Sequence, residues 1–142
     1  MINTCYDERN DYKNGDVSTD NLAIVPIGPD SCRIEFYCEF YHDIRDKGIY
    51  IPEQIDCYYV AEISSRAFQN ADIDYVSIPK TVKTISSSAF EGSKVKTINF
   101  IEGVHPIHHR AFSNCKNQST INFFSSTLQT IKDEVFYGSV LT

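Results

Sequence analysis

The chain has 142 residues, a net charge of −6 and 42% apolar residues, with nine Phe, nine Tyr and no Trp. This composition predicts a folded chain with a hydrophobic core rather than a disordered one. The negative charge argues against binding to nucleic acid or to an anionic membrane surface. No run approaches the ~20 apolar residues of a membrane-spanning helix, so we expect no membrane insertion.

The acidic residues are concentrated in the first part of the chain. Residues 1–56 hold 12 acidic and 5 basic residues, a net charge of −7, whereas residues 57–142 hold 7 and 8, a net charge of +1. The first ten residues have no apolar stretch behind a basic start, so they do not resemble a secretory signal. The uneven charge indicates two regions of different character, the first being an acidic N-terminal segment.

Residues 22–41 predict a β-hairpin. An apolar run over 22–27 is followed by Gly-Pro-Asp-Ser at 28–31, a strong turn signal, and then by an alternating run over 32–40. In that second run Cys32 and Ile34 fall on one face, whereas Tyr37 falls on the other. We predict that residues 20–48 form a cap over the apolar surface of the region that follows.

The remainder of the chain is an internal repeat. Four segments align on an Ala-Phe or Val-Phe step whose Phe positions are 22, 22 and 24 residues apart: Phe68, Phe90, Phe112 and Phe136. The second residue after each Phe is Asn or Gly, and a small residue follows it. Asn and Gly enter the left-handed backbone region at the lowest cost, so each unit is expected to turn there.

A short alternating strand follows each of the first three turns, as in Val95-Lys-Thr-Ile98-Asn-Phe100. One unit of this length cannot bury its own apolar face, but stacked units bury it continuously, with the Phe residues in one column. The predicted fold is mainly β: a solenoid of about four ~22-residue repeats over residues 49–142, the last incomplete, with an N-terminal β-hairpin cap within residues 1–48.

The pattern Ile-Pro-x-x-Val-x-x-Ile-x-x-x-Ala-Phe-x-Gly-x-x-Val-x-x-Ile, from Ile78 to Ile98, resembles the BspA-like leucine-rich repeat. The resemblance covers roughly residues 49–142 and does not extend to the first 48. It implies a curved leucine-rich-repeat solenoid with a non-enzymatic binding or adhesion role. It also implies display at a cell surface or secretion.

Cys115 lies near His105, His108 and His109, a combination that suggests a zinc site or a Cys/His nucleophile. The repeat favours another interpretation, because Cys115 occupies a slot held elsewhere by small residues: Ala71, Ser93 and Ser139. We therefore expect a packed thiol, surface histidines, and no metal, cofactor or catalytic residue. The chain has five cysteines, an odd number, so at least one stays unpaired.

The outward strand positions are the predicted ligand-binding residues. If the units stack in register, they form two ladders, one of Tyr50, Tyr75, Thr97 and Thr120 and one of Ser77, Asn99 and Asn122. A row of Tyr, Thr and Asn suits binding, because Tyr offers contact area with a polar tip. An ordinary solvated sheet face is an equally weighted alternative.

Two functions follow from these patterns. The first is a non-enzymatic interaction or adhesion module that binds a protein or glycan ligand through the solenoid face. The second is an assembly role inside the cell, in which the solenoid self-associates. Only residues 140–142 follow the last turn, so the closing strand is missing. Either the sequence is a fragment of a longer repeat array, or another chain covers this unpaired edge, most simply as a homodimer through the C-terminal end.

Overall fold

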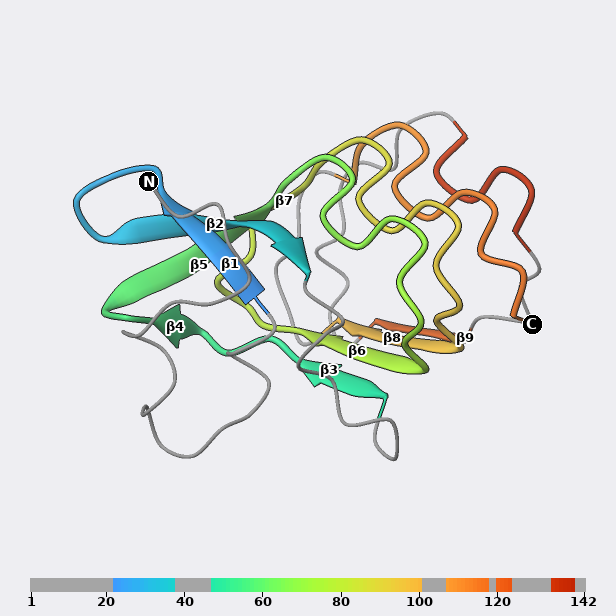
Figure 1. Cartoon of the computed structure of the whole chain (residues 1–142), viewed down its shortest axis with the longest axis horizontal. Helices are drawn as coiled ribbons and strands as arrows, with labels where there is room; N and C mark the ends of the chain where they lie inside the picture. The colour runs from blue at the N-terminus through green and yellow to red at the C-terminus, as the bar shows by residue number, and fades with distance from the viewer. Residues whose placement is uncertain (1–21, 38–46, 101–106, 118–119, 124–133, 140–142) are drawn as a thin grey trace.

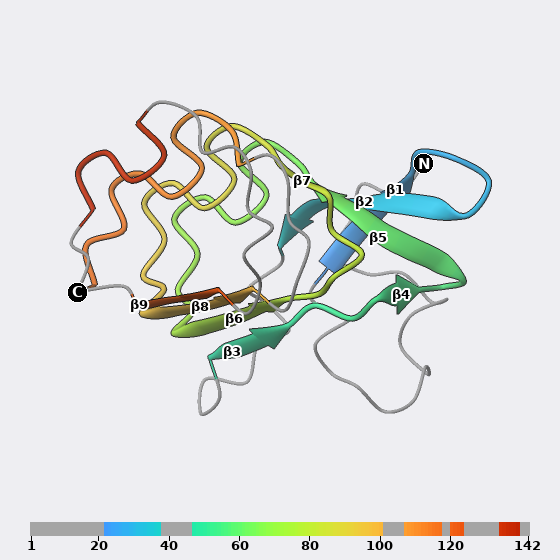
Figure 2. The same ribbon diagram turned by 180° about the vertical axis from the view of Figure 1, so that it is seen from behind.

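The computed structural model describes residues 22–37, 47–100, 107–117, 120–123 and 134–139, which form two β-sheets joined by stacked turns (Figures 1 and 2). Successive units lie side by side, and buried apolar residues from both sheets and from the turns make one core. The described residues include no helix of the length and apolarity needed to cross a membrane. The predicted mainly β solenoid is confirmed.

The first sheet joins the hairpin to one side of the solenoid. Its strand order is β1 (Leu22–Pro26), β2 (Ser31–Tyr37), β5 (Tyr58–Ile63) and β4 (Gln54–Ile55), and β7 (Thr84–Ile85) also pairs with β5. β1 and β2 are antiparallel, as the Gly-Pro-Asp-Ser turn predicts, whereas β2 and β5 are parallel. The hairpin is therefore part of the solenoid sheet, with β2 in the position that a preceding unit would take.

The second sheet is parallel throughout. Its order is β3 (Gly48–Tyr50), β6 (Tyr75–Ile78), β8 (Thr97–Phe100) and β9 (Thr120–Phe123), along one side of the molecule (Figure 2). β8 and β9 share the sequence Thr-Ile-Asn-Phe and pair residue for residue. Parallel strands lie about 4.8 Å apart, so this face repeats its backbone at that interval.

Each unit turns at two left-handed backbone positions. The predicted row is confirmed, with positive φ at every member: Asn70, Gly92, Asn114 and Gly138. A second row lies four residues earlier, with φ between 57° and 61°: Arg66, Ser88, Arg110 and Glu134. This conformation strains a residue that has a side chain by about 1–3 kcal/mol, and other contacts in the fold must offset that strain. In each turn the carbonyl of this residue accepts a hydrogen bond from the N–H three residues later, as from Gln69 to Arg66 at 3.2 Å. The Ser88 N–H also donates to the His109 carbonyl of the next unit at 3.1 Å.

The repeated phenylalanines form the predicted column. The ring centroids of Phe68 and Phe90 are 4.7 Å apart with an interplanar angle of 4°, and those of Phe90 and Phe112 are 5.0 Å apart at 15°. Phe136 continues the stack 5.7 Å from Phe112. The Phe68 N–H also donates to the Ala89 carbonyl at 2.7 Å, and the pattern recurs in the next units. The backbone and the rings therefore advance with the same step.

Tyr37 is the first member of this column, contrary to its predicted outward position. Its ring stacks on Phe68 at 5.4 Å, and its N–H donates to the Ala67 carbonyl at 2.8 Å, as the column phenylalanines do one unit later. The alternation of β2 is correct at Cys32 and Ile34, which are both buried. It does not place Tyr37, because the register of β2 against β1 shifts between Ile34 and Phe36, and such a bulge breaks the strict alternation of faces. The hairpin thus covers the first Phe with an aromatic ring.

The Asn and Gly residues of the turns interlock. A Cβ added at Gly92 would stand 2.3 Å from the Asn70 Oδ1 atom, and one at Gly138 would stand 2.4 Å from the Asn114 Oδ1 atom. Each Asn side chain therefore occupies the space that the glycine of the next unit leaves open. Both glycines also have positive φ, so a side chain is disfavoured there for two separate reasons.

Candidate binding face

The outer face of the β3–β6–β8–β9 sheet holds the predicted ligand-binding positions. Ile49, Val76 and Ile98 are fully buried, so the residues before and after each of them lie on the opposite face. The pairing gives two rows, one of Gly48, Tyr75, Thr97 and Thr120 and one of Tyr50, Ser77, Asn99 and Asn122.

The predicted place of Tyr50 is therefore wrong. We expected it in the row of Tyr75, but its backbone partner is Ser77, and Gly48 is the partner of Tyr75. The error has a physical cause. The β4–β5 hairpin interrupts the repeat after β3, so no repeat spacing fixes the register of β3 against β6. The other six residues, three in each row, lie in the rows expected for them.

Tyr50 and Tyr75 nevertheless form a pair. Their ring centroids are 5.2 Å apart with an interplanar angle of 40°, across the diagonal between the two rows. Gly48, beside Tyr75, has no side chain to separate the rings. Tyr50 is 53% exposed and Tyr75 is half-buried. The two rings thus make an open, tilted aromatic surface at the β3 end of the sheet.

The remaining described members of the face are small and polar. Thr97 and Asn99 are half-buried, whereas Ser77 is only 8% exposed and offers little side-chain surface to a ligand. The strand Thr120–Phe123 continues both rows through its backbone register. The ligand-binding role of these seven residues remains a prediction.

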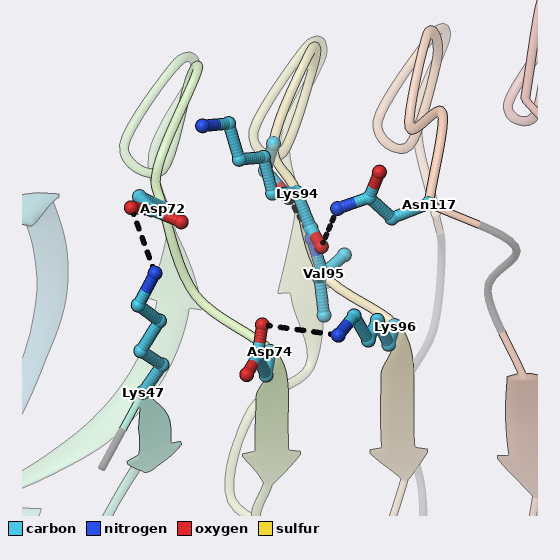
Figure 3. A network of polar contacts seen from close by, with 8 residues as sticks. Lys47, Asp72, Asp74, Lys94, Val95, Lys96 and Asn117 are labelled. Atoms are coloured by element: carbon cyan, nitrogen blue, oxygen red, sulfur yellow. Dashed lines mark hydrogen bonds and ion pairs between the residues drawn. The ribbon is translucent and has the colours of Figure 1, made fainter. Parts of the chain in front are cut away.

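Charged residues lie at the start of the strands instead of on the face. The Lys47 Nζ atom is 3.0 Å from the Asp72 Oδ2 atom, and the Lys96 Nζ atom is 3.9 Å from the Asp74 Oδ1 atom (Figure 3). Exposed pairs of this kind contribute about 0–1 kcal/mol each. Their effect on the surface is clearer, because each pair joins two neighbouring units. Lys94 adds a further positive charge to the same rim (Figure 3).

Asn117 adds a neutral link to the same rim. Its Nδ2 atom donates to the Lys94 carbonyl at 3.0 Å, one unit away (Figure 3). The sequence contains a signal for this rim that our prediction missed. Asp74 and Lys96, which form one of the two ion pairs, are 22 residues apart, so an acid of one unit aligns with a base of the next. A search for opposite charges at equivalent repeat positions would have found it.

The outer side of the first sheet has a different chemistry. Arg33 is in register with Glu62, and Glu62 with Thr84. The Arg33 Nε atom also donates to the Glu35 Oε2 atom at 2.7 Å. This side therefore presents charged side chains, whereas the outer face of the second sheet presents neutral ones.

The turn side contains a further polar cluster around Glu91. The Glu91 carboxylate accepts hydrogen bonds from the hydroxyls of Ser113 and Ser88, both at 3.0 Å, and from the Gln69 amide at 3.4 Å. These bonds, first that from Ser113, hold the pKa of Glu91 below its ordinary value, although desolvation acts in the opposite direction. Because the three donors come from three successive units, the cluster serves to bind the stack together.

Cys115 occupies the packed slot that the repeat predicts. It is 1% exposed, and its thiol donates to the Phe90 carbonyl at 3.3 Å. Burial raises the pKa of Cys115 to about 11. Such a thiol is almost fully protonated at neutral pH and is a poor nucleophile.

The two described histidines near this thiol in sequence, His108 and His109, form no metal-binding group with it. His109 is exposed, with its Nε2 atom 3.7 Å from the Glu134 Oε2 atom, and His108 is half-buried. His105 lies outside the described residues. Within the part of the chain that the structure describes, no three His, Cys, Asp or Glu residues are grouped to hold a metal ion.

The family follows from a comparison with known protein families. A model of the BspA-type leucine-rich repeat region matches residues 34–142 with six copies. The chain belongs to the BspA-type leucine-rich repeat family. Its proteins are generally non-enzymatic repeat proteins and typically serve as protein-interaction modules. The match begins inside β2, whereas the repeat pattern by itself suggests a start near residue 49. The matched range includes Tyr37, whose ring stacks on Phe68.

Solved structures of bacterial proteins resemble this BspA-type chain. A leucine-rich repeat protein from T. pallidum is 28% identical with a TM-score of 0.68, over 81% of this chain and 52% of that protein. One from Bacteroides capillosus is 17% identical with a TM-score of 0.69, over 86% and 94% of the two chains. The chain thus spans about half the length of the T. pallidum protein. A search of curated proteins found no match.

The predicted C-terminal edge stays a prediction. Residues 140–142 lie outside the described part of this BspA-type chain, as do residues 124–133 before the last turn. Self-association through that end, as a homodimer or a larger assembly, is therefore an expectation from the sequence. Light scattering over a range of protein concentrations tests it, since a monomer at every concentration would contradict it.

Proposed function

We propose that the chain is an interaction or adhesion module that binds a protein or glycan ligand through the outer face of the β3–β6–β8–β9 sheet. The observation that supports this most directly is the pair of tyrosine rings on that face, 5.2 Å apart, with Tyr50 53% exposed. An exposed aromatic pair has no part in the buried core. Tyrosine is also enriched where proteins bind their partners.

The surrounding structure suits a binding surface. Both tyrosines extend from strands whose backbones are paired in parallel register, and neighbouring units stack through a continuous core. A side chain on such a base loses little freedom when a ligand binds, because the strand already fixes its position. For an interface of given area, binding is tighter when fewer groups must become ordered as the complex forms.

The test compares two double variants of the same composition. Tyr75→Ala with Thr97→Ala removes one row of the proposed face, and Tyr59→Ala with Thr84→Ala removes the same residue types from strands of the first sheet. Tyr59 is 46% exposed, so its loss should not disturb the core. A panel of matrix proteins and oligosaccharides is first screened for a ligand. We expect the first variant to bind that ligand more weakly by at least about 1 kcal/mol.

The control variant is expected to bind as the unaltered chain does. Circular dichroism of both variants checks that they remain folded. Equal affinity of the unaltered chain and the Tyr75→Ala, Thr97→Ala variant would remove this face from consideration. An equal loss in both variants would mean that the effect is not specific to the face.

A further inference from the structure

The outer face of the second sheet is uncharged. Its described positions are Gly48, Tyr50, Tyr75, Ser77, Thr97 and Asn99. Charged side chains are described around it at the strand starts, where Lys47 pairs with Asp72 and Lys96 with Asp74, and where Lys94 adds a positive charge (Figure 3). The face itself therefore offers no charged group that could pair with an ionic ligand. A neutral ligand is the complement of such a surface.

The tyrosine pair indicates which chemical groups that ligand should present. An aromatic ring presents a negative face, which attracts weakly positive groups such as polarised C–H bonds. One side of a sugar ring with equatorial substituents is a flat array of C–H bonds, and its edges carry hydroxyls. We propose that this face binds a neutral oligosaccharide with equatorial linkages, seated on Tyr50 and Tyr75. This proposal rests on the proposed function and names its ligand class.

The polar residues beside the tyrosines can bind the remaining sugar units of the oligosaccharide. Thr97 and Asn99 supply a hydroxyl and an amide, which donate to and accept from sugar hydroxyls. They follow the tyrosines on the next strand, and β9 continues the rows by its register. The strands repeat at about 4.8 Å, an interval similar to one sugar ring in an extended equatorially linked chain. An oligosaccharide lying across the strands would therefore meet an equivalent backbone position at each ring.

A protein ligand fits these observations less well. Protein interfaces need a well-packed, water-excluding centre, typically of aromatic and apolar anchors. Beyond the two tyrosines, the described outward residues are Ser, Thr and Asn, and Ser77 is 8% exposed. A surface of hydroxyls and amides around two rings suits a ligand that is itself covered with hydroxyls.

The test measures binding of cellohexaose and chitohexaose, both neutral and equatorially linked, to the full chain by calorimetry. Maltohexaose, which has axial linkages, and a heparin hexasaccharide, which is charged, are the comparison ligands. We expect at least one of the first two to bind, with at least tenfold lower affinity for the comparison ligands. Tyr75→Ala should lower that affinity at least tenfold, whereas Tyr75→Phe should keep most of it, because the ring face makes the contact. Tyr59→Ala is the matched control and should change nothing.

The outcomes separate this proposal from the proposed function. Failure of both equatorially linked sugars to bind at millimolar concentration overturns the ligand class, as does preference for heparin or maltohexaose. If a protein then binds and the Tyr75→Ala, Thr97→Ala variant loses it, the face is a binding site and only its ligand is wrong. If a sugar binds but Tyr75→Ala and Tyr59→Ala change its affinity alike, the face is refuted as the site, both for the sugar and for the proposed function.

Discussion

Replacement of Phe90 by alanine tests the stacked column most directly. Phe90 is fully buried and lies between Phe68 and Phe112, with ring centroids 4.7 and 5.0 Å away. Loss of a core Phe costs about 3–5 kcal/mol. The two ring pairs supply roughly 0.5–1.5 kcal/mol each within that amount. Since a domain is stable by about 5–15 kcal/mol in all, this change should remove a large part of the stability.

Phe136 provides the matched comparison within the same column. It is only partly buried, and its stacking partner among the described rings is Phe112, at 5.7 Å. Phe136→Ala should therefore cost roughly half as much as Phe90→Ala, since it gives up one ring pair and less buried area. Phe90→Leu keeps an apolar side chain and isolates the loss of stacking, about 1–3 kcal/mol for two pairs.

Urea unfolding gives the three free energies. Circular dichroism follows the strands, and tyrosine fluorescence supplies a second probe, because the chain has nine Tyr and no Trp. Coincident transitions and an unchanged denaturant slope would justify comparing the midpoints. A cost below about 2 kcal/mol for Phe90→Ala would refute the column as a main source of stability. Equal costs at Phe90 and Phe136 would refute the argument from position.

Three further predictions concern the turns, a buried hydroxyl and the thiols. Gly92→Ala should destabilise the chain by about 1–2 kcal/mol, because φ is 71° and the new Cβ would stand 2.3 Å from the Asn70 Oδ1 atom. Asn70→Gly in addition should restore part of the loss, and strictly additive thermal shifts would contradict the interlock. Thr81→Val should leave the free energy of unfolding in urea unchanged or raise it by up to about 1 kcal/mol. The reason is that the Thr81 Oγ1 atom is buried without a hydrogen-bond partner. A clear loss of stability would show that the hydroxyl has a partner. Iodoacetamide at pH 8 should label exposed Cys57 in the native chain but not Cys115, because burial raises the pKa of the Cys115 thiol to about 11. Peptide mass mapping identifies the labelled cysteine. Rapid labelling of Cys115 in the native chain would contradict its burial.

The sequence predicted the parts of the molecule that recur. A buried Phe, a left-handed Asn or Gly and a small packed residue return in each unit, because stacked units place equivalent residues in equivalent surroundings. Cys115 illustrates this: its neighbours in the repeat predicted burial, against the suggestion of the nearby histidines. The same logic predicted the rows of Thr and Asn on the second sheet, which lie in register as expected.

The left-handed row at Arg66, Ser88, Arg110 and Glu134 recurs as well, but it was not predicted. These residues share no chemical type, and none is Gly or Asn. What they share is a backbone contact, because the carbonyl of each accepts a hydrogen bond from the N–H three residues later in the same turn. A repeated position can be recognised in a sequence only where its conformation or packing requires a particular type of side chain.

The sequence by itself determined that these residues stack as a solenoid and which of them fill its core, because burial recurs with the unit. Only the tertiary structure decided where the non-repeating segments enter. β2 takes the place of a preceding unit and brings Tyr37 onto the aromatic column. β3 sets Gly48, not Tyr50, beside Tyr75, and so brings two rings together across the diagonal. Strand register between unlike segments depends on pairing across the sheet, which no local pattern specifies.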